Sequence, residues 1–122
     1  MRFALLTSLL VVACATSRLP ASLRGYDVLV EGKDEQSREL ARAMRGYGFR
    51  VREKVRGGSR PTAALIYFTF SDPGPGEPSW LHVRLADTRS GVIVGAATVP
   101  LDSQVTSPRS RANAAVLALV AP

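Results

Sequence analysis

Ala63-Ala-Leu-Ile-Tyr-Phe-Thr-Phe-Ser71 is the strongest strand signal in the chain and the stretch that decides its fold. Aromatic and β-branched residues, which fit the pleated surface of a sheet, make up much of it. Apolar side chains occur on both of its faces, so we expect this strand to lie in the centre of a sheet. The face expected to point into the core consists of Ala64, Ile66, Phe68 and Phe70, and the opposite face of Leu65, Tyr67 and Thr69.

Two further strands are expected after this one. Asp72–Ser79 (DPGPGEPS) is rich in proline and glycine, so it predicts a loop. Trp80–Ala86 alternates between apolar and polar residues, as a strand with one buried face does. Asp87–Gly91 is typical of a hairpin turn closed by glycine, and Val92–Leu101 returns as the last strand. The residues of the first of these strands that should face the core are Leu81, Val83 and Leu85.

The remaining elements lie at the two ends of the domain. Tyr26–Glu31 alternates and predicts a strand, and Asp34 suits the N-cap of a helix that runs to about Arg45. Phe49–Val55 alternates again and predicts a second strand. Near the C-terminus, Ser107-Pro108 is typical of a cap followed by proline at the first helical position.

These elements predict an α+β fold in the order β-α-β-β-β-β-α. The first βαβ unit should have parallel strands, because a helix crosses between them. The later turns are short enough for antiparallel hairpins. We therefore expect one mixed, mainly antiparallel five-stranded sheet, with both amphipathic helices packed on one face.

The first fourteen residues are typical of a secretory signal. Arg2 gives a positive start, Phe3–Ala13 is a mainly apolar run, and Cys14 is the only cysteine of the chain. An apolar run of this length is shorter than the roughly 20 residues that a transmembrane helix needs. The alternative is a buried core helix that ends at a chance cysteine.

The segment Val11-Val12-Ala13-Cys14 resembles the lipobox of bacterial lipoproteins. The resemblance implies that residues 1–13 are a signal peptide and that Cys14 is lipidated and anchors the chain in a membrane. Residues 14–25 would then be the lipidated cysteine and a tether, and residues 26–122 a single domain. Ala15 stands where aspartate tends to retain such lipoproteins at the inner membrane, so the resemblance implies the outer membrane, facing the periplasm.

Two segments of the domain weakly resemble small periplasmic α/β lipoproteins. Leu40–Val51 (LARAMRGYGFRV) is a helix, a Gly-Phe pair and a strand, and Leu81–Val99 is a strand, an Asp-x-x-Ser-Gly hairpin and a strand. Lipoproteins of curli secretion and activators of peptidoglycan synthases are similar. The resemblance implies a non-enzymatic interaction or assembly component of the cell envelope, and it transfers no functional residues.

The chain is basic, with a formal net charge of +6, and all its basic residues except Lys33 and Lys54 are arginine. Guanidinium groups bind carboxylate and phosphate in a bidentate manner, although a biased genomic composition would give the same excess. An exported protein rarely meets nucleic acid, so we expect none as a partner. Envelope proteins, peptidoglycan and the membrane are the partners expected.

Catalytic chemistry is not expected. His82 is the only histidine, and no serine lies in a nucleophile-elbow pattern. A metal site usually needs several histidine or cysteine ligands, so we expect neither a metal nor another cofactor.

A basic and aromatic sheet face is the candidate binding surface. The alternating strand Phe49–Val55 places its basic residues on one side, and aromatic residues of later strands could share that side. There are three alternatives: the basic residues pair with Asp27 and Glu31, the face is merely solvated, or the tether covers it. The alternative function is that the chain binds anionic glycans or lipid headgroups through this surface, instead of docking to proteins. The candidate residues are Arg50, Arg52, Lys54, Arg56, Tyr67, Trp80, His82 and Arg84.

Overall fold

The computed structural model describes residues 19–54, 60–71, 74–76, 79–102 and 104–121. The expected signal peptide, Cys14 and Arg56 lie outside these residues. The elements follow the predicted order β-α-β-β-β-β-α. They are β1 (Asp27–Leu29), α1 (Glu35–Tyr47), β2 (Arg50–Arg52), β3 (Thr62–Ser71), β4 (Ser79–Asp87), β5 (Ile93–Leu101) and α2 (Pro108–Val120).

The five strands form one mixed sheet in the order β2-β1-β3-β4-β5. β1 is parallel to both of its neighbours, and β3, β4 and β5 are antiparallel, so the expected fold class is confirmed. One connection was predicted wrongly: β2 and β3 do not form a hairpin, because β1 lies between them. Every residue of β1 is buried, whereas β2 carries two arginines and takes the edge of the sheet.

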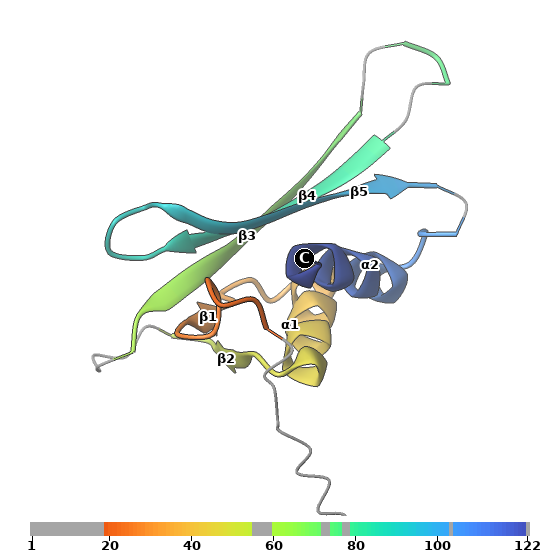
Figure 1. The fold of residues 1–122 in the computed structure, drawn as a ribbon. Coiled ribbons are helices and arrows are strands. Elements are labelled where there is room, and N and C mark those ends of the chain that lie inside the picture. The colour runs from red at the N-terminus through yellow and green to blue at the C-terminus, as the bar shows by residue number, and fades with distance from the viewer. Residues whose placement is uncertain (1–18, 55–59, 72–73, 77–78, 103, 122) are drawn as a thin grey trace, which may run out of the picture.

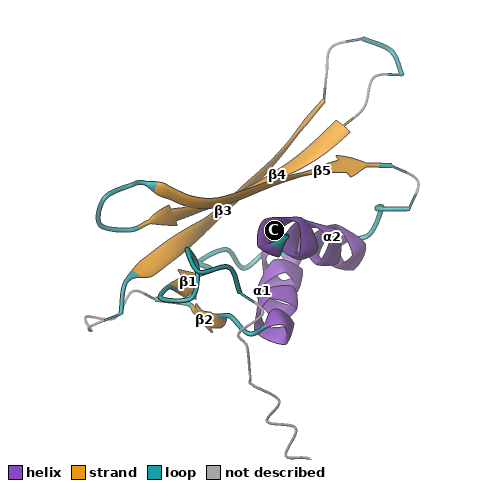
Figure 2. Cartoon of the chain, in the orientation of Figure 1, coloured by secondary structure: helices purple, strands orange, loops and turns teal. Residues whose placement is uncertain are grey.

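Both helices lie on one face of the sheet, as Figures 1 and 2 show. α2 packs against β4, β5 and α1, and α1 packs against β2. One cluster of buried residues joins Leu40 of α1, Leu81 of β4 and Ala115 of α2. We call the helix-covered side the inner face and the opposite side the outer face. No described element covers the outer face of β3, β4 and β5.

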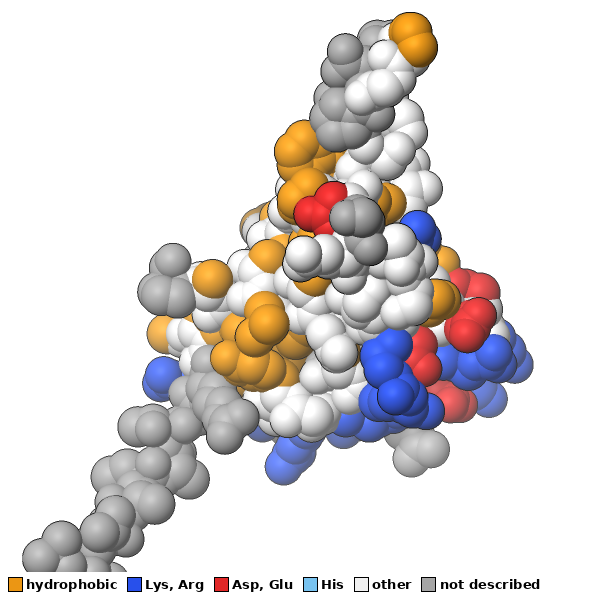
Figure 3. All heavy atoms as spheres, turned by 90° about the vertical axis from the view of Figure 1, so that its right-hand side faces the viewer, with side chains coloured by type: hydrophobic (Ala, Val, Ile, Leu, Met, Phe, Trp, Pro, Cys, Tyr) orange, Lys and Arg blue, Asp and Glu red, His pale blue; other side chains and the backbone are white. Residues whose placement is uncertain are grey.

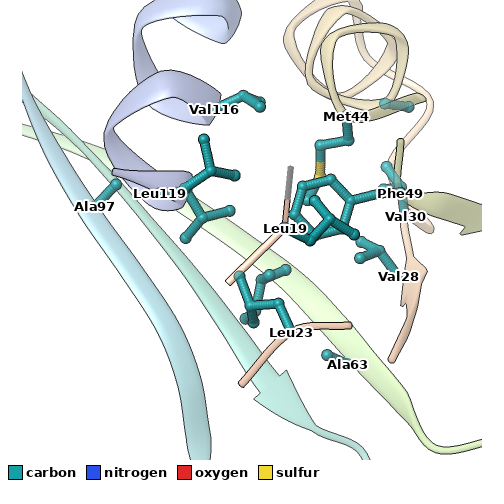
Figure 4. Close-up of a cluster of buried hydrophobic side chains, with 13 residues drawn as sticks. Leu19, Leu23, Val28, Val30, Met44, Phe49, Ala63, Ala97, Val116 and Leu119 are labelled. Carbon is teal, nitrogen blue, oxygen red and sulfur yellow. The ribbon is translucent and has the colours of Figure 1, made fainter. Parts of the chain in front are cut away.

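The folded domain begins earlier than the predicted boundary at Tyr26. Leu19 and Leu23 are 7% and 1% exposed and belong to the larger core cluster. Leu19 lies beside Met44 of α1 and Phe49, which follows the C-terminal end of that helix (Figure 4). A turn in which Leu23 N–H donates to the Pro20 carbonyl, at 2.9 Å, brings Leu23 inward. The last part of the expected tether is therefore core, because its two leucines fill the space between the sheet and the helices.

A glycine of β5 makes room for this packing. A Cβ placed on Gly95 would lie 3.2 Å from Leu119 Cδ1 and 3.3 Å from Leu23 Cδ2. These separations are closer than ordinary van der Waals contact. α2 and the Leu19–Gly25 segment can therefore approach the sheet because residue 95 has no side chain.

The expected faces of β3 are reversed. Ile66, Phe68 and Phe70 are exposed on the outer face, whereas Leu65 and Tyr67 pack against the core on the inner face. β3 pairs with β4 in the register Tyr67↔Val83, so the inward residues of β4 fix the inward residues of β3. The inward face predicted for β4, with Leu81, Val83 and Leu85, is confirmed.

The predicted caps are confirmed. The Asp34 carboxylate accepts the Ser37 backbone N–H at 3.1 Å at the start of α1, and Gly48 ends the helix at φ 112°. Ser107 caps α2, with Pro108 at its first position. In the β4–β5 turn, Gly91 has φ 76°, which is the left-handed region expected of the closing glycine.

Asp34 gives a test of these local contacts. Hydrogen bonds from the Ser37 hydroxyl and backbone and from the Tyr67 hydroxyl lower the pKa of Asp34 from 3.8 to about 2. Because the folded-state pKa is below the unfolded one, the stabilisation is present above about pH 4 and is lost as the pH falls to about 2. We expect Asp34→Ala to cost about 1 kcal/mol at pH 7, and its deficit against wild type to shrink over that window. Denaturant melts at several pH values measure this, and a deficit that stays constant down to pH 2 would contradict it.

Candidate functional site

The outer face of β3, β4 and β5 carries a continuous surface of large side chains, which we call the aromatic face. Its apolar members are unusually exposed, with Ile66 at 49%, Phe68 at 43% and Phe70 at 40%. The strand register places these residues directly beside outward residues of the neighbouring strands. The aromatic face consists of Ile66, Phe68 and Phe70 of β3, Trp80, His82 and Arg84 of β4, and Ala96, Thr98 and Pro100 of β5.

His82 is held at the centre of the aromatic face. Its ring stacks on Phe68 with centroids 5.0 Å apart, and Arg84 lies over the same Phe68 ring at 5.9 Å. Arg84 Nε donates to His82 Nε2 at 2.7 Å, and His82 Nδ1 lies 2.8 Å from Thr98 Oγ1. The neutral imidazole with its proton on Nδ1 satisfies both contacts. These contacts fix an aromatic, a basic and a hydroxyl group in one arrangement across three strands.

The basic residues of β2 lie on the same outer face but at the other end of it. Arg50 and Arg52 are paired in register with Asp27 and Leu29 of β1, which in turn pair with Thr62 and Ala64. Since the aromatic residues occupy the far half of β3, from Ile66 onward, the sheet separates the two groups. The predicted surface is therefore divided into a basic end and an aromatic end.

Arg52 has a structural role, because it pairs with Asp27, which was one of the alternatives expected for the basic residues. The Asp27 carboxylate is 2% exposed, and it accepts from Arg52 Nε at 2.6 Å and from Arg60 Nε at 2.9 Å. A buried carboxylate needs such partners, so both guanidinium groups are occupied. The expected pairing of the basic residues with Asp27 is thus confirmed for Arg52. Arg50 is exposed, and Lys54 lies beyond the end of β2.

Tyr67 does not belong to the candidate surface. Its ring packs against the core on the inner face, and its hydroxyl donates to the Asp34 carboxylate at the start of α1. Burial, followed by this hydrogen bond, raises the pKa of the Tyr67 hydroxyl. Tyr67 therefore links β3 to the N-cap of α1. The prediction that it shares the outer face with Trp80, His82 and Arg84 was wrong, because the faces of β3 were reversed.

Ile66, Phe68 and Phe70 are members of the aromatic face that sequence reasoning missed. Both faces of the β3 segment are apolar, so alternation alone cannot say which one is buried. The pairing of this segment with Trp80–Ala86 is the signal that could have identified its exposed face. An antiparallel hairpin across the Asp72–Ser79 loop sets Phe70 opposite Trp80, and Trp80 was already expected to point outward.

A concave surface lies between α1 and the ends of β1 and β2, and we call it the basic groove. It consists of two adjoining cavities of about 370 Å³ and 400 Å³ that share Val30, Gly32, Arg38 and Glu53. Its basic lining residues are Lys33, Arg38, Arg42, Arg45 and Lys54. In Figure 3, Lys and Arg side chains gather on the lower part of the face shown, the part at which α1 and β2 lie in Figure 1.

The described residues offer little for metal or acid–base chemistry. In the part of the chain that the structure covers, no three histidine, cysteine or acidic side chains converge to hold a metal ion. His82 contacts an arginine, a threonine and a phenylalanine, and no carboxylate is among these partners. What the aromatic face presents is exposed aromatic rings beside a guanidinium, an imidazole and a hydroxyl group. Neither described helix has the length and apolarity needed to span a bilayer.

Comparisons of the chain with protein-family models, curated proteins and solved structures find no match.

Proposed function

We propose that this protein is a lipid-anchored, non-enzymatic docking component of the bacterial cell envelope, and that it binds a partner protein through the aromatic face. The observation that carries the proposal is the exposure of Phe68 and Phe70 on a sheet face that no described element covers. Contiguous exposed apolar surface on a soluble domain marks interaction sites. The lipobox-like sequence that ends at Cys14 supports an anchor on the periplasmic side of the outer membrane.

A protein partner fits the aromatic face better than a bilayer does. Binding hot spots between proteins combine buried aromatic residues with arginine, and they cluster at the centre of the interface. Here, His82 and Arg84 are fixed by specific contacts to Phe68 and Thr98. Such fixed polar groups can match hydrogen-bonding groups on a folded partner, whereas a fluid bilayer presents none at a defined position.

The aromatic face can be tested without disturbing the core. We expect Phe68→Ala/Phe70→Ala to weaken partner binding about tenfold or more, because hot-spot aromatics each contribute on the order of 2 kcal/mol. A photo-crosslinking residue at Ala96, which is exposed on the same face, reports binding in native membranes. The cross-linked product should fall in the variant while its melting midpoint stays close to that of wild type.

A matched control removes apolar side chains elsewhere that are more exposed than Phe68 and Phe70. Val92 and Leu117 are 59% and 58% exposed and do not belong to the aromatic face. Val92→Ala/Leu117→Ala should keep the cross-link at the wild-type level. The proposal is wrong if the Phe68/Phe70 variant retains its cross-link, or if the control loses it to the same extent.

A further inference from the structure

The basic groove has a net positive lining. Arg38, Arg42 and Arg45 lie at i, i+4 and i+7 on α1, so they form one row along the side of the helix that faces the groove. Lys33 and Lys54 line its other end. Glu31 and Glu53 are the two acidic residues among the lining side chains, against five basic ones.

The cations of the groove are mostly unengaged. Arg42 is 66% exposed and contacts Glu39 only at 3.9 Å, and Glu39 lies closer to Arg109, at 3.5 Å. An ion pair with so exposed a partner contributes about 0–1 kcal/mol. Within the described residues, Lys33, Arg38, Arg45 and Lys54 form no ion pair. By contrast, Arg52 and Arg60 form ion pairs with the buried carboxylate of Asp27. Guanidinium groups aligned beside a cavity are suited to the oxygens of phosphate groups.

The position of Leu19, close in sequence to Cys14, indicates that membrane phosphate groups lie near the basic groove. Leu19 packs beside Met44 and Phe49 at the C-terminal end of α1, the end that also carries Arg45 (Figure 4). Only Ala15–Arg18 separate Leu19 from Cys14. Fully extended, that length of chain reaches about 17 Å. A membrane anchor at Cys14 therefore keeps this end of α1 close to the bilayer surface.

We infer that the basic groove binds the phosphate groups of anionic phospholipid headgroups, and that it orients the domain on its membrane. This inference rests on the lipid anchor of the proposed function. In the resulting orientation, the basic groove faces the bilayer. The β3–β4 hairpin, with Phe70 and Trp80 of the aromatic face, extends in the opposite direction (Figure 1).

The test uses the full chain in nonionic detergent and short-chain lipids as soluble probes. Dihexanoyl phosphatidylglycerol should bind and shift the amide resonances of α1, and dihexanoyl phosphatidylcholine should bind much more weakly. Arg38→Gln/Arg45→Gln should weaken phosphatidylglycerol binding about tenfold or more, since two charge-assisted hydrogen bonds are lost. Binding should also fall steeply above about 0.15 M salt.

A charge-matched control separates the groove from net charge. Arg89→Gln/Arg109→Gln removes the same two charges from the β4–β5 turn and from the start of α2, outside the groove. It should leave phosphatidylglycerol binding near the wild-type value. An equal loss in the control would overturn the groove as the site. Equal binding of the two lipids, or equally tight binding of inorganic phosphate, would overturn the lipid headgroup as its ligand.

The anchor is read out separately. Cys14→Ser should release the chain from the membrane fraction or leave it as an uncleaved precursor, because a hydroxyl does not replace the thiol that is lipidated. Unchanged membrane association and an unchanged mass of the mature chain would contradict the anchor. Binding of the soluble lipid to the groove does not depend on Cys14, so the two failures are distinguishable.

Discussion

Leu23→Ala should destabilise the domain by about 2–5 kcal/mol, the cost of removing a buried leucine side chain and leaving a cavity. Leu23 is 1% exposed and lies near Gly95 of β5, in the cluster that also contains Leu119 of α2. A domain of this size has a total stability of roughly 5–15 kcal/mol, so the loss is a large fraction of it. The thermal midpoint should fall by about 10 °C or more.

Leu117→Ala is the matched control for this change. Leu117 is 58% exposed on α2, so the same substitution removes little buried surface. Its midpoint should stay within a few degrees of wild type, since surface changes away from buried features usually alter stability by no more than about 0.5 kcal/mol. A Leu23 variant that melts like the Leu117 variant would show that the Leu19–Gly25 segment is a tether after all.

Leu81→Ala is expected to have an effect of the same size, and it tests which face of the sheet is buried. Leu81 is fully buried on the inner face of β4, within the cluster that joins both helices to the sheet. Its loss should cost about 2–5 kcal/mol. Urea unfolding, with the slope unchanged and the midpoint lowered, would identify the effect as a loss of stability.

Phe68→Ala is the comparison that sets the two faces apart. Phe68 is 43% exposed, and its contacts are mainly with Phe70, His82 and Arg84 on the outer face. We expect a cost of about 1 kcal/mol or less, near the contribution of a single aromatic pair. A larger loss for Phe68→Ala than for Leu81→Ala would mean that the helices cover the other side of β3.

Features that depend on a few neighbouring residues could be predicted from the sequence. Asp34 and Ser107 were recognised as caps, and Gly91 as the end of a hairpin turn, because each role follows from local backbone chemistry. The order of elements followed from hydrophobic periodicity. The orientation of β4 was also predictable, since within Trp80–Ala86 the polar residues His82 and Arg84 lie on one side and Leu81, Val83 and Leu85 on the other.

Features that depend on pairing between distant segments could not be predicted. β3 is apolar on both faces, so only its register with β4 determines that Phe68 points outward. The position of β1 between β2 and β3 depends on competition among strands. Leu19 and Leu23 lie in a stretch without periodicity, and their burial depends on a gap that the helices and the sheet leave between them.

The position of β1 between β2 and β3 also bears on how the chain folds. β3, β4 and β5 are joined by short connections, so their pairing requires little loop closure, whereas both partners of β1 come later in the sequence than β1 itself. Contacts between distant segments form slowly, because the chain entropy of the intervening loop is lost first. During synthesis β1 emerges early, yet it must wait for β3 before both of its edges are paired. Until then, the apolar residues Val28 and Leu29 of β1, with Val30 directly after them, are open to association with other chains.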